Sequence, residues 1–210
     1  MIGSSFARRS ALAAALAAGS LLSACAPLLL GGAVVGGSLM AVDRRTSGTQ
    51  VEDQGIELKA MTRVRETIGD RGHVSATSYN RMLLLTGEVP SDADKAAVEQ
   101  NVARVDNVRS IVNELGVIGN ASLTSRSSDA ILTSKVKASY LDAKDLQAQA
   151  VKVVTERGVV YLMGRVTERE ATRAAEIARG VGGVQKVVRV FEVVSEAELA
   201  DMAPKQVQKP

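Results

Sequence analysis

GVVYLMGRVTEREATRAAEIAR, residues 158–179, contains the signals that decide the fold. Residues 159–166 are mainly β-branched or apolar, a pattern that predicts a strand buried on at least one face. Thr167 stands three residues before Glu170, the spacing of a capping box at a helix start. The alanines that follow recur at helical spacing, which predicts a slim helix over 168–179 that lies close on a sheet.

Glycines at 180, 182 and 183 end this predicted helix, and residues 184–194 return to strand composition. A strand, a helix and a second strand with short joints form a right-handed parallel crossover. The stretch therefore predicts a mixed sheet with helices packed on it.

An earlier part of the chain has the same order of signals. Residues 82–89 predict a strand, Ser91 an N-cap with Asp94 three places on, and residues 108–115 a further strand. Pairs 76 or 77 positions apart match along the chain: Gly87 with Gly164, Ile56 with Leu132, Lys59 with Lys135, Ala60 with Val136 and Val64 with Tyr140. We interpret this as a tandem duplication, and two copies favour two domains over a solenoid.

The N-terminus predicts a lipoprotein signal peptide over residues 1–24. Arg8 and Arg9 precede an apolar run that ends in LSAC, so the single cysteine, Cys25, falls where a lipobox requires its thiol. A buried thiol, an uncleaved anchor helix and a twin-arginine signal are the alternatives. Acylation of Cys25 predicts stable attachment to a membrane, and Ala26, where an aspartate would indicate inner-membrane retention, favours the outer one.

The chain between this cysteine and the first domain is apolar and rich in glycine. Residues 25–43 could be a membrane helix with a small-residue face, a tether at the lipid surface, or a segment packed on the folded part. We favour the tether because its glycine pairs lower helix propensity. The remaining predicted boundaries are a first domain over 44–118, a linker over 119–127, a second domain over 128–194 and a mobile tail over 195–210.

Composition argues against catalysis, metals and nucleic acid. The chain has one histidine, His73, and one cysteine, which together cannot form a credible metal centre or catalytic triad. Removing Arg8 and Arg9 leaves 24 basic against 23 acidic residues, too balanced for a general nucleic-acid binder. We expect no cofactor and no catalytic residue.

Positive charge gathers in the second repeat. Residues 44–118 hold 10 Lys or Arg and 11 Asp or Glu, whereas residues 126–194 hold 12 and 8. The helix predicted over 129–142 turns Leu132, Val136 and Tyr140 inward. It leaves Ile131, Lys135, Lys137 and Ala138 on another surface, where apolar and cationic side chains together suit an anionic bilayer. The alternative is that Ile131 belongs to the apolar stripe that faces the core.

Two copies of helix, strand, strand, helix, strand, each with a strand glycine before its second helix, resemble the BON-domain family. The resemblance covers about residues 44–194. Together with the lipobox and the segments RRTSGTQVEDQGIELK and VYLMGRVTEREA, it is close to the two-domain outer-membrane lipoproteins of this family. It implies an α+β fold with a three-stranded mixed sheet on two helices in each domain. It also implies a periplasm-facing protein that binds phosphatidylglycerol through the second domain, gathers at the division site and supports envelope integrity.

In such proteins the lipid contact centres on the first helix of the second domain, where a tryptophan inserts at the interface. This chain has no tryptophan, and Ile131 occupies the matching position. The resemblance assigns Lys135 and Lys137 as charge contacts and Leu141 as an apolar contact, while Gly87 and Gly164 match structural glycines. The competing hypothesis is an adaptor for outer-membrane assembly proteins, acting through strand edges or the first domain; an enzyme comes third.

Overall fold

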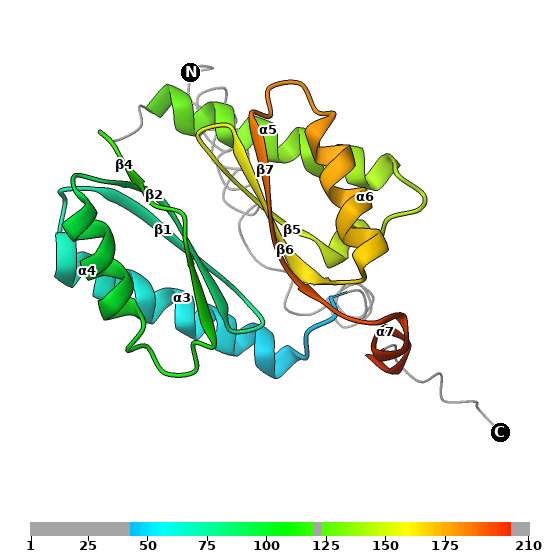
Figure 1. Cartoon of the computed structure of the whole chain (residues 1–210), viewed down its shortest axis with the longest axis horizontal. Helices are drawn as coiled ribbons and strands as arrows, with labels where there is room; N and C mark the ends of the chain where they lie inside the picture. Colours follow the sequence, from blue (N-terminus) through cyan, green and yellow to red (C-terminus); the bar gives the residue numbers. More distant parts are fainter. Residues whose placement is uncertain (1–42, 120–122, 203–210) are drawn as a thin grey trace, which may run out of the picture. The chain divides into compact units, whose positions relative to one another are not determined.

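A computed structural model describes residues 43–119 and 123–202, which fold as an α+β protein with two similar domains (Figure 1). The elements of the first domain are α3 (Ser47–Ile68), β1 (His73–Tyr79), β2 (Met82–Val89), α4 (Asp92–Val102), β3 (Ser110–Asn113) and β4 (Gly116–Val117). Those of the second are α5 (Leu123–Asp142), the 3-10 turn η2 (Ala148–Ala150), β5 (Lys152–Glu156), β6 (Val159–Val166), α6 (Glu168–Arg179) and β7 (Lys186–Val193), followed by α7 (Glu196–Met202).

Both sheets have the predicted mixed topology. In the first domain β2 pairs antiparallel with β1 and parallel with β3 and β4, which are two pieces of one broken strand. In the second domain β6 pairs antiparallel with β5 and parallel with β7. The helix between the parallel strands is α4 or α6, so each domain contains the predicted crossover, and the fold class is confirmed.

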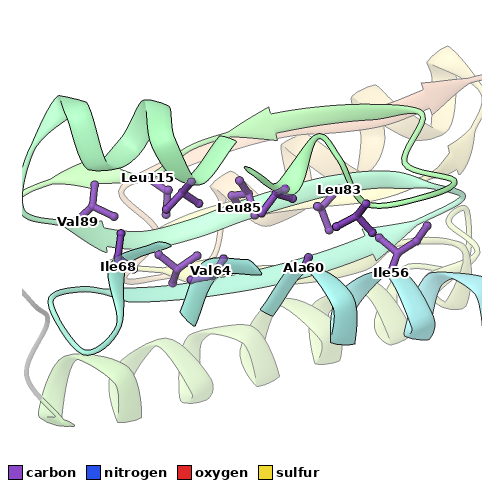
Figure 2. Close-up of a cluster of buried hydrophobic side chains, with 12 residues drawn as sticks. Ile56, Ala60, Val64, Ile68, Leu83, Leu85, Val89 and Leu115 are labelled. Atoms are coloured by element: carbon purple, nitrogen blue, oxygen red, sulfur yellow. The ribbon is translucent and has the colours of Figure 1, made fainter. Parts of the chain in front are cut away.

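The core of the first domain lies between its helices and one face of its sheet. Figure 2 shows Ile56, Ala60, Val64 and Ile68 of α3 directed at Leu83, Leu85 and Val89 of β2 and at Leu115. The buried apolar residues recur every three or four positions along α3 and at every second or fourth position along β2. Each element therefore presents one apolar face to the other. The second domain repeats this packing with Val136 and Tyr140 of α5, alanines of α6, and Val160 and Leu162 of β6.

The capping box of α6 is present as predicted. The Thr167 hydroxyl accepts from the Glu170 amide, and the Glu170 carboxylate accepts from the Thr167 amide. The predicted bounds of β2, β6 and α6 match those of the structure.

Two predicted irregular segments contain helix. Helix α5 begins at Leu123, inside the predicted linker, because no glycine or proline interrupts residues 123–142 and a helix packed on a sheet can propagate through weak formers such as serine. Helix α7 occupies part of the predicted mobile tail. There the Ser195 hydroxyl accepts from the Glu198 amide and the Glu198 carboxylate accepts from the Ser195 amide, a second capping box that the sequence contained.

The two strand glycines, Gly87 and Gly164, pack against the backbone of a neighbouring segment. A Cβ atom on Gly87 would lie 2.0 Å from the His73 carbonyl oxygen, and one on Gly164 would lie 2.3 Å from that of Ala150. Gly87 also has φ +114°, which side chains with a Cβ rarely adopt. Both positions therefore exclude larger residues for reasons of backbone contact.

The sheet faces away from the helices pack on each other. Tyr79 and Leu84 of the first domain form one buried cluster with Tyr161, Met163 and Val190 of the second. Residues 159–166 are thus buried on both faces, with Val160 and Leu162 toward the helices and Tyr161 and Met163 toward the other domain. These sheet faces are not available to a separate partner.

Candidate functional site

Helix α5 divides its side chains between the core and an open surface. Leu132, Val136 and Tyr140 are buried, and the Tyr140 hydroxyl donates to the Ala174 carbonyl at 3.0 Å. The candidate lipid-binding residues are all exposed: Ile131, Lys135, Lys137, Ala138 and Leu141. Ile131 is 59% exposed and Leu141 68%, so Ile131 does not widen the core stripe.

The outer face of α5 carries two distinct patches. Ile131, Lys135 and Ala138 line a shallow hollow together with Ala130 and Ser134. Lys137 and Leu141 instead line a pocket of about 380 Å³ that also includes Asp43, Arg45 and Tyr79. The sequence placed the five residues in one set, and the structure separates them into a central hollow and a pocket at its flank.

The lysines of this face are available to an external anion. Lys135 and Lys137 are exposed, and in residues 43–119 and 123–202 neither has an ion-pair partner. Three other cations of the second domain have ion-pair partners: Lys152 with Glu57 at 3.0 Å, Arg157 with Glu88 at 3.2 Å and Arg189 with Glu168 at 3.0 Å. An excess of positive charge therefore remains beside exposed apolar side chains.

This arrangement suits a surface ligand better than an enclosed substrate. Apolar side chains next to unpaired cations on one helix face match the interface of an anionic bilayer, where methyl groups enter and ammonium groups meet phosphates. Nowhere in the described part of the chain do three histidine, cysteine or acidic side chains gather as a metal site would need. None of the helices described combines the length and the apolar character needed to cross a bilayer. Cys25, the predicted acylation site, lies outside the described residues.

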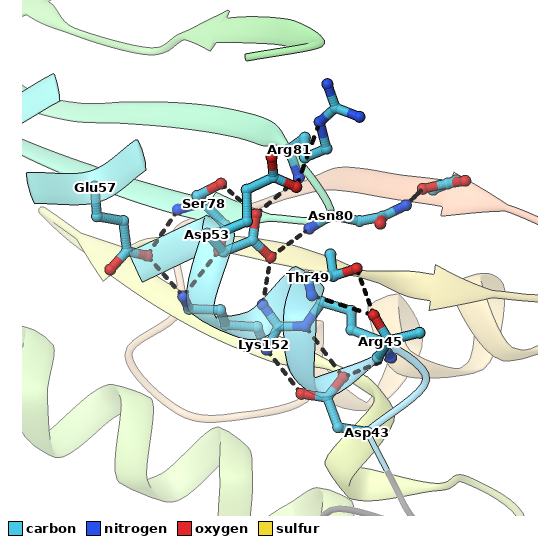
Figure 3. A network of polar contacts seen from close by, with 12 residues as sticks. Asp43, Arg45, Thr49, Asp53, Glu57, Ser78, Asn80, Arg81 and Lys152 are labelled. Carbon is cyan, nitrogen blue, oxygen red and sulfur yellow. Dashed lines mark hydrogen bonds and ion pairs between the residues drawn. The ribbon is translucent and has the colours of Figure 1, made fainter. Parts of the chain in front are cut away.

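The first helix of each domain carries a buried carboxylate that was not predicted from the sequence. Asp53 of α3 accepts from the Ser78 hydroxyl at 2.7 Å and from the amides of Asn80 and Arg81 at 2.8 Å, and it also pairs with Arg45 (Figure 3). Burial acts to raise the pKa of Asp53, but these hydrogen bonds outweigh it and lower that pKa below its ordinary value.

Asp129 of α5 has the corresponding position in the second domain. It accepts from the amides of Arg157 and Gly158, both at 2.8 Å, and so holds the turn between β5 and β6. The signal was present, because Asp53 and Asp129 are 76 positions apart, as are other matched residues of the repeat.

A group of acids lies where the two domains meet. Glu88 of β2 is fully buried and pairs with Arg157 of the second domain. Burial, and then the negative charges of Glu88 and Asp129, raise the pKa of Glu156 to about 7, against the opposing effect of Arg126 and Arg157. This contact between domains can therefore take up a proton near neutral pH.

Comparison with known proteins finds similarity to both repeats. The model of the BON domain matches residues 53–119 and again residues 128–195. The chain is 37% identical over 183 residues to the "Outer membrane lipoprotein DolP" of Haemophilus influenzae, covering 86% of this chain and 94% of that one. It is 31% identical to a "21 kDa hemolysin" of Actinobacillus pleuropneumoniae, over 73% of this chain and 80% of that protein. It is 28% identical to "Osmotically-inducible protein Y" of Escherichia coli, over 67% and 72%.

Proposed function

Since the chain belongs to the BON-domain family, we propose that it is a lipid-anchored outer-membrane protein whose second domain binds anionic phospholipid through the outer face of α5. Phosphatidylglycerol is the expected lipid. The protein binds lipid without catalysing a reaction, and this binding supports the integrity of the cell envelope. The proposal includes enrichment at the division site, which imaging of a fluorescent fusion would test.

One observation carries this proposal: α5 exposes Ile131 and Leu141 beside Lys135 and Lys137, which have no ion-pair partner among the described residues. Each lysine near an anionic leaflet contributes about 1 kcal/mol, and full burial of one isoleucine or leucine contributes roughly 1.5–3 kcal/mol. These terms suffice for a weak, reversible contact.

Attachment at Cys25 would make a weak contact effective. The similarity to an outer-membrane lipoprotein and the LSAC signal both support an acylated N-terminus that faces the periplasm. An anchored domain meets the lipid surface at high effective concentration, so α5 does not need to hold the protein on the membrane by itself. Its lipid contact would then orient the protein and select the lipid.

Flotation of the soluble fragment 43–210 with liposomes tests the proposal. The fragment contains every residue of the three apolar clusters, so both domains retain their cores without the tether. We expect it to float with vesicles that contain phosphatidylglycerol. With vesicles of a zwitterionic lipid alone, it should remain in the bottom fraction. Equal flotation with both, or none with either, would contradict selective binding of anionic lipid.

A specific observation favours the adaptor as the second candidate. Val51 and Leu58, seven residues apart on α3, are 69% and 74% exposed and present an apolar strip on the first domain. An outer-membrane assembly protein could bind there. Replacing both with aspartate and crosslinking in the envelope separates the two functions, because the adaptor loses its protein partner while flotation with lipid is retained.

A further inference from the structure

Arg44 binds the second domain, although it lies three residues before α3, the first helix of the first domain. Its guanidinium donates to both carboxylate oxygens of Glu170, at 2.7 and 2.8 Å, to the Arg165 carbonyl at 2.8 Å and to Gln147 Oε1 at 3.0 Å. The side chains of Arg44 and Glu170 are 8% and 7% exposed. Arg44 thus joins the capping box of α6, and this buried bidentate pair is a strong and directional contact.

Arg45 binds the first domain. It donates to Asp53 Oδ2 at 2.8 Å and to both carboxylate oxygens of Asp43, and its guanidinium lies 4.1 Å from the centre of the Tyr79 ring. Asp53 in turn holds the turn between β1 and β2, as Figure 3 shows. Adjacent arginines are therefore fixed in different domains, and we call residues 43–46 the clasp.

The clasp lies beside the C-terminal half of α5. Asp43 lines the same pocket as Lys137 and Leu141, two of the candidate lipid contacts. Any chain that precedes Asp43 must start from this point. Seventeen residues separate Asp43 from Cys25, and they cannot span more than about 60 Å.

We infer that Arg44 and Arg45 are positioning residues that fix the exit of the membrane tether beside α5, so that this helix faces the leaflet carrying the protein's own acyl anchor. The inference rests on the proposed function. It adds that the lipid bound by α5 belongs to the anchoring membrane and not to an opposing one. Without the clasp, the tether would join the folded part at α3 and leave the orientation of α5 unspecified.

The test uses the full-length acylated protein with Ser134→Cys labelled by an environment-sensitive fluorophore. Ser134 is exposed on α5, and Cys25 has no free thiol once acylated. The protein is reconstituted in vesicles containing phosphatidylglycerol, and a spin-labelled lipid quencher is placed either in those vesicles or only in a second vesicle population. We expect quenching by the anchoring vesicles alone.

The double variant Arg44→Gln/Arg45→Gln should lose this quenching several-fold and become measurably quenched by the second population. Arg63→Gln/Arg65→Gln, which removes two exposed arginines of α3, is the matched control and should behave as wild type. Arg44→Lys/Arg45→Lys keeps the charge but not the bidentate geometry, and should show a smaller loss in the same direction. It takes the place of the glutamine variant if circular dichroism shows that the latter is unfolded.

Flotation of fragment 43–210 separates the two hypotheses. The single variant Arg44→Gln of the fragment should float with phosphatidylglycerol as well as wild type, because Arg44 lines neither the hollow of Ile131 and Lys135 nor the pocket of Lys137 and Leu141. If the fragment floats but the full-length variant is still quenched like wild type, the clasp does not position α5 and the inference is overturned. If the wild-type fragment does not float, the proposed function itself fails.

Discussion

Asp53 and Asp129 perform the same structural role 76 positions apart. Each is a buried carboxylate on the first helix of its domain, and each accepts backbone amides from the turn between the first two strands. The duplication has therefore preserved a helix-to-hairpin connection as well as an apolar core. That connection determines where α3 and α5 lie along their sheets.

Loss of either aspartate should destabilise its domain. Asp129→Ala leaves the amides of Arg157 and Gly158 without their acceptor, and unsatisfied buried groups cost about 1–3 kcal/mol each. We expect Asp53→Ala to cost more, because Ser78 and Arg45 also lose their acceptor. Urea unfolding measures both, with the exposed Asp106→Ala as control. A free energy of unfolding unchanged in both variants would show that water replaces the carboxylates at no cost.

Gly164→Val should destabilise the second domain by about 2 kcal/mol or more, because the new Cβ would overlap the Ala150 carbonyl. Gly182→Ala is the matched control, since a Cβ there meets nothing within 4 Å. Thermal unfolding should show a lower midpoint for the valine variant and little change for the alanine variant. Equal midpoints would mean that the η2 turn, which contains Ala150, can move away from β6 without loss of stability.

The raised pKa of Glu156 predicts that the stability of the folded protein depends on pH. Its folded pKa of about 7 lies above the ordinary value of 4.5, so the folded state holds the proton more tightly and stability falls as pH rises between these values. Glu156→Gln keeps the neutral form at every pH. It should be about 1–3 kcal/mol more stable than wild type at pH 8 and nearly equal near pH 4. Parallel curves of unfolding free energy against pH would contradict this.

Much of the fold could be predicted because its signals are local. The strand over 159–166, the capping box at Thr167 and the repeat each depend on residues close in sequence or on a fixed offset. The outer face of α5 followed from the same periodicity, which placed Ile131 and Lys135 outside the buried stripe that contains Leu132.

What could not be predicted depends on contacts between distant parts of the chain. Arg44 and Glu170 are 126 positions apart, and no periodic pattern indicates which acid an arginine will meet. The packing of Tyr79 on the second domain could not be predicted either. The sequence of a strand that is buried on both faces does not indicate which element covers each face. The division of the α5 residues into two patches follows from these same contacts.

Membrane attachment should depend on Cys25. Cys25→Ala removes the thiol that would carry the acyl chains, and we expect the variant to fractionate as a soluble periplasmic protein or an unprocessed precursor. Fractionation of the envelope with an antibody to the second domain measures this. If the variant remains wholly in the outer membrane, the apolar residues before Asp43 are sufficient as an anchor.

The most direct test of the central claim is liposome flotation of fragment 43–210 carrying Lys135→Glu and Lys137→Glu. Two cations contribute about 1 kcal/mol each and the new acids repel the leaflet, so we predict loss of binding to phosphatidylglycerol vesicles.

Ile131→Ala should weaken binding and Ile131→Trp should strengthen it. Added salt should weaken binding of the wild type, because salt screens charge but does not affect apolar burial. The matched control, Lys59→Glu/Arg63→Glu on α3 of the first domain, should float like wild type. Loss of flotation in the control with retention in the α5 variant would contradict the account, because the lipid surface would then lie on the first domain.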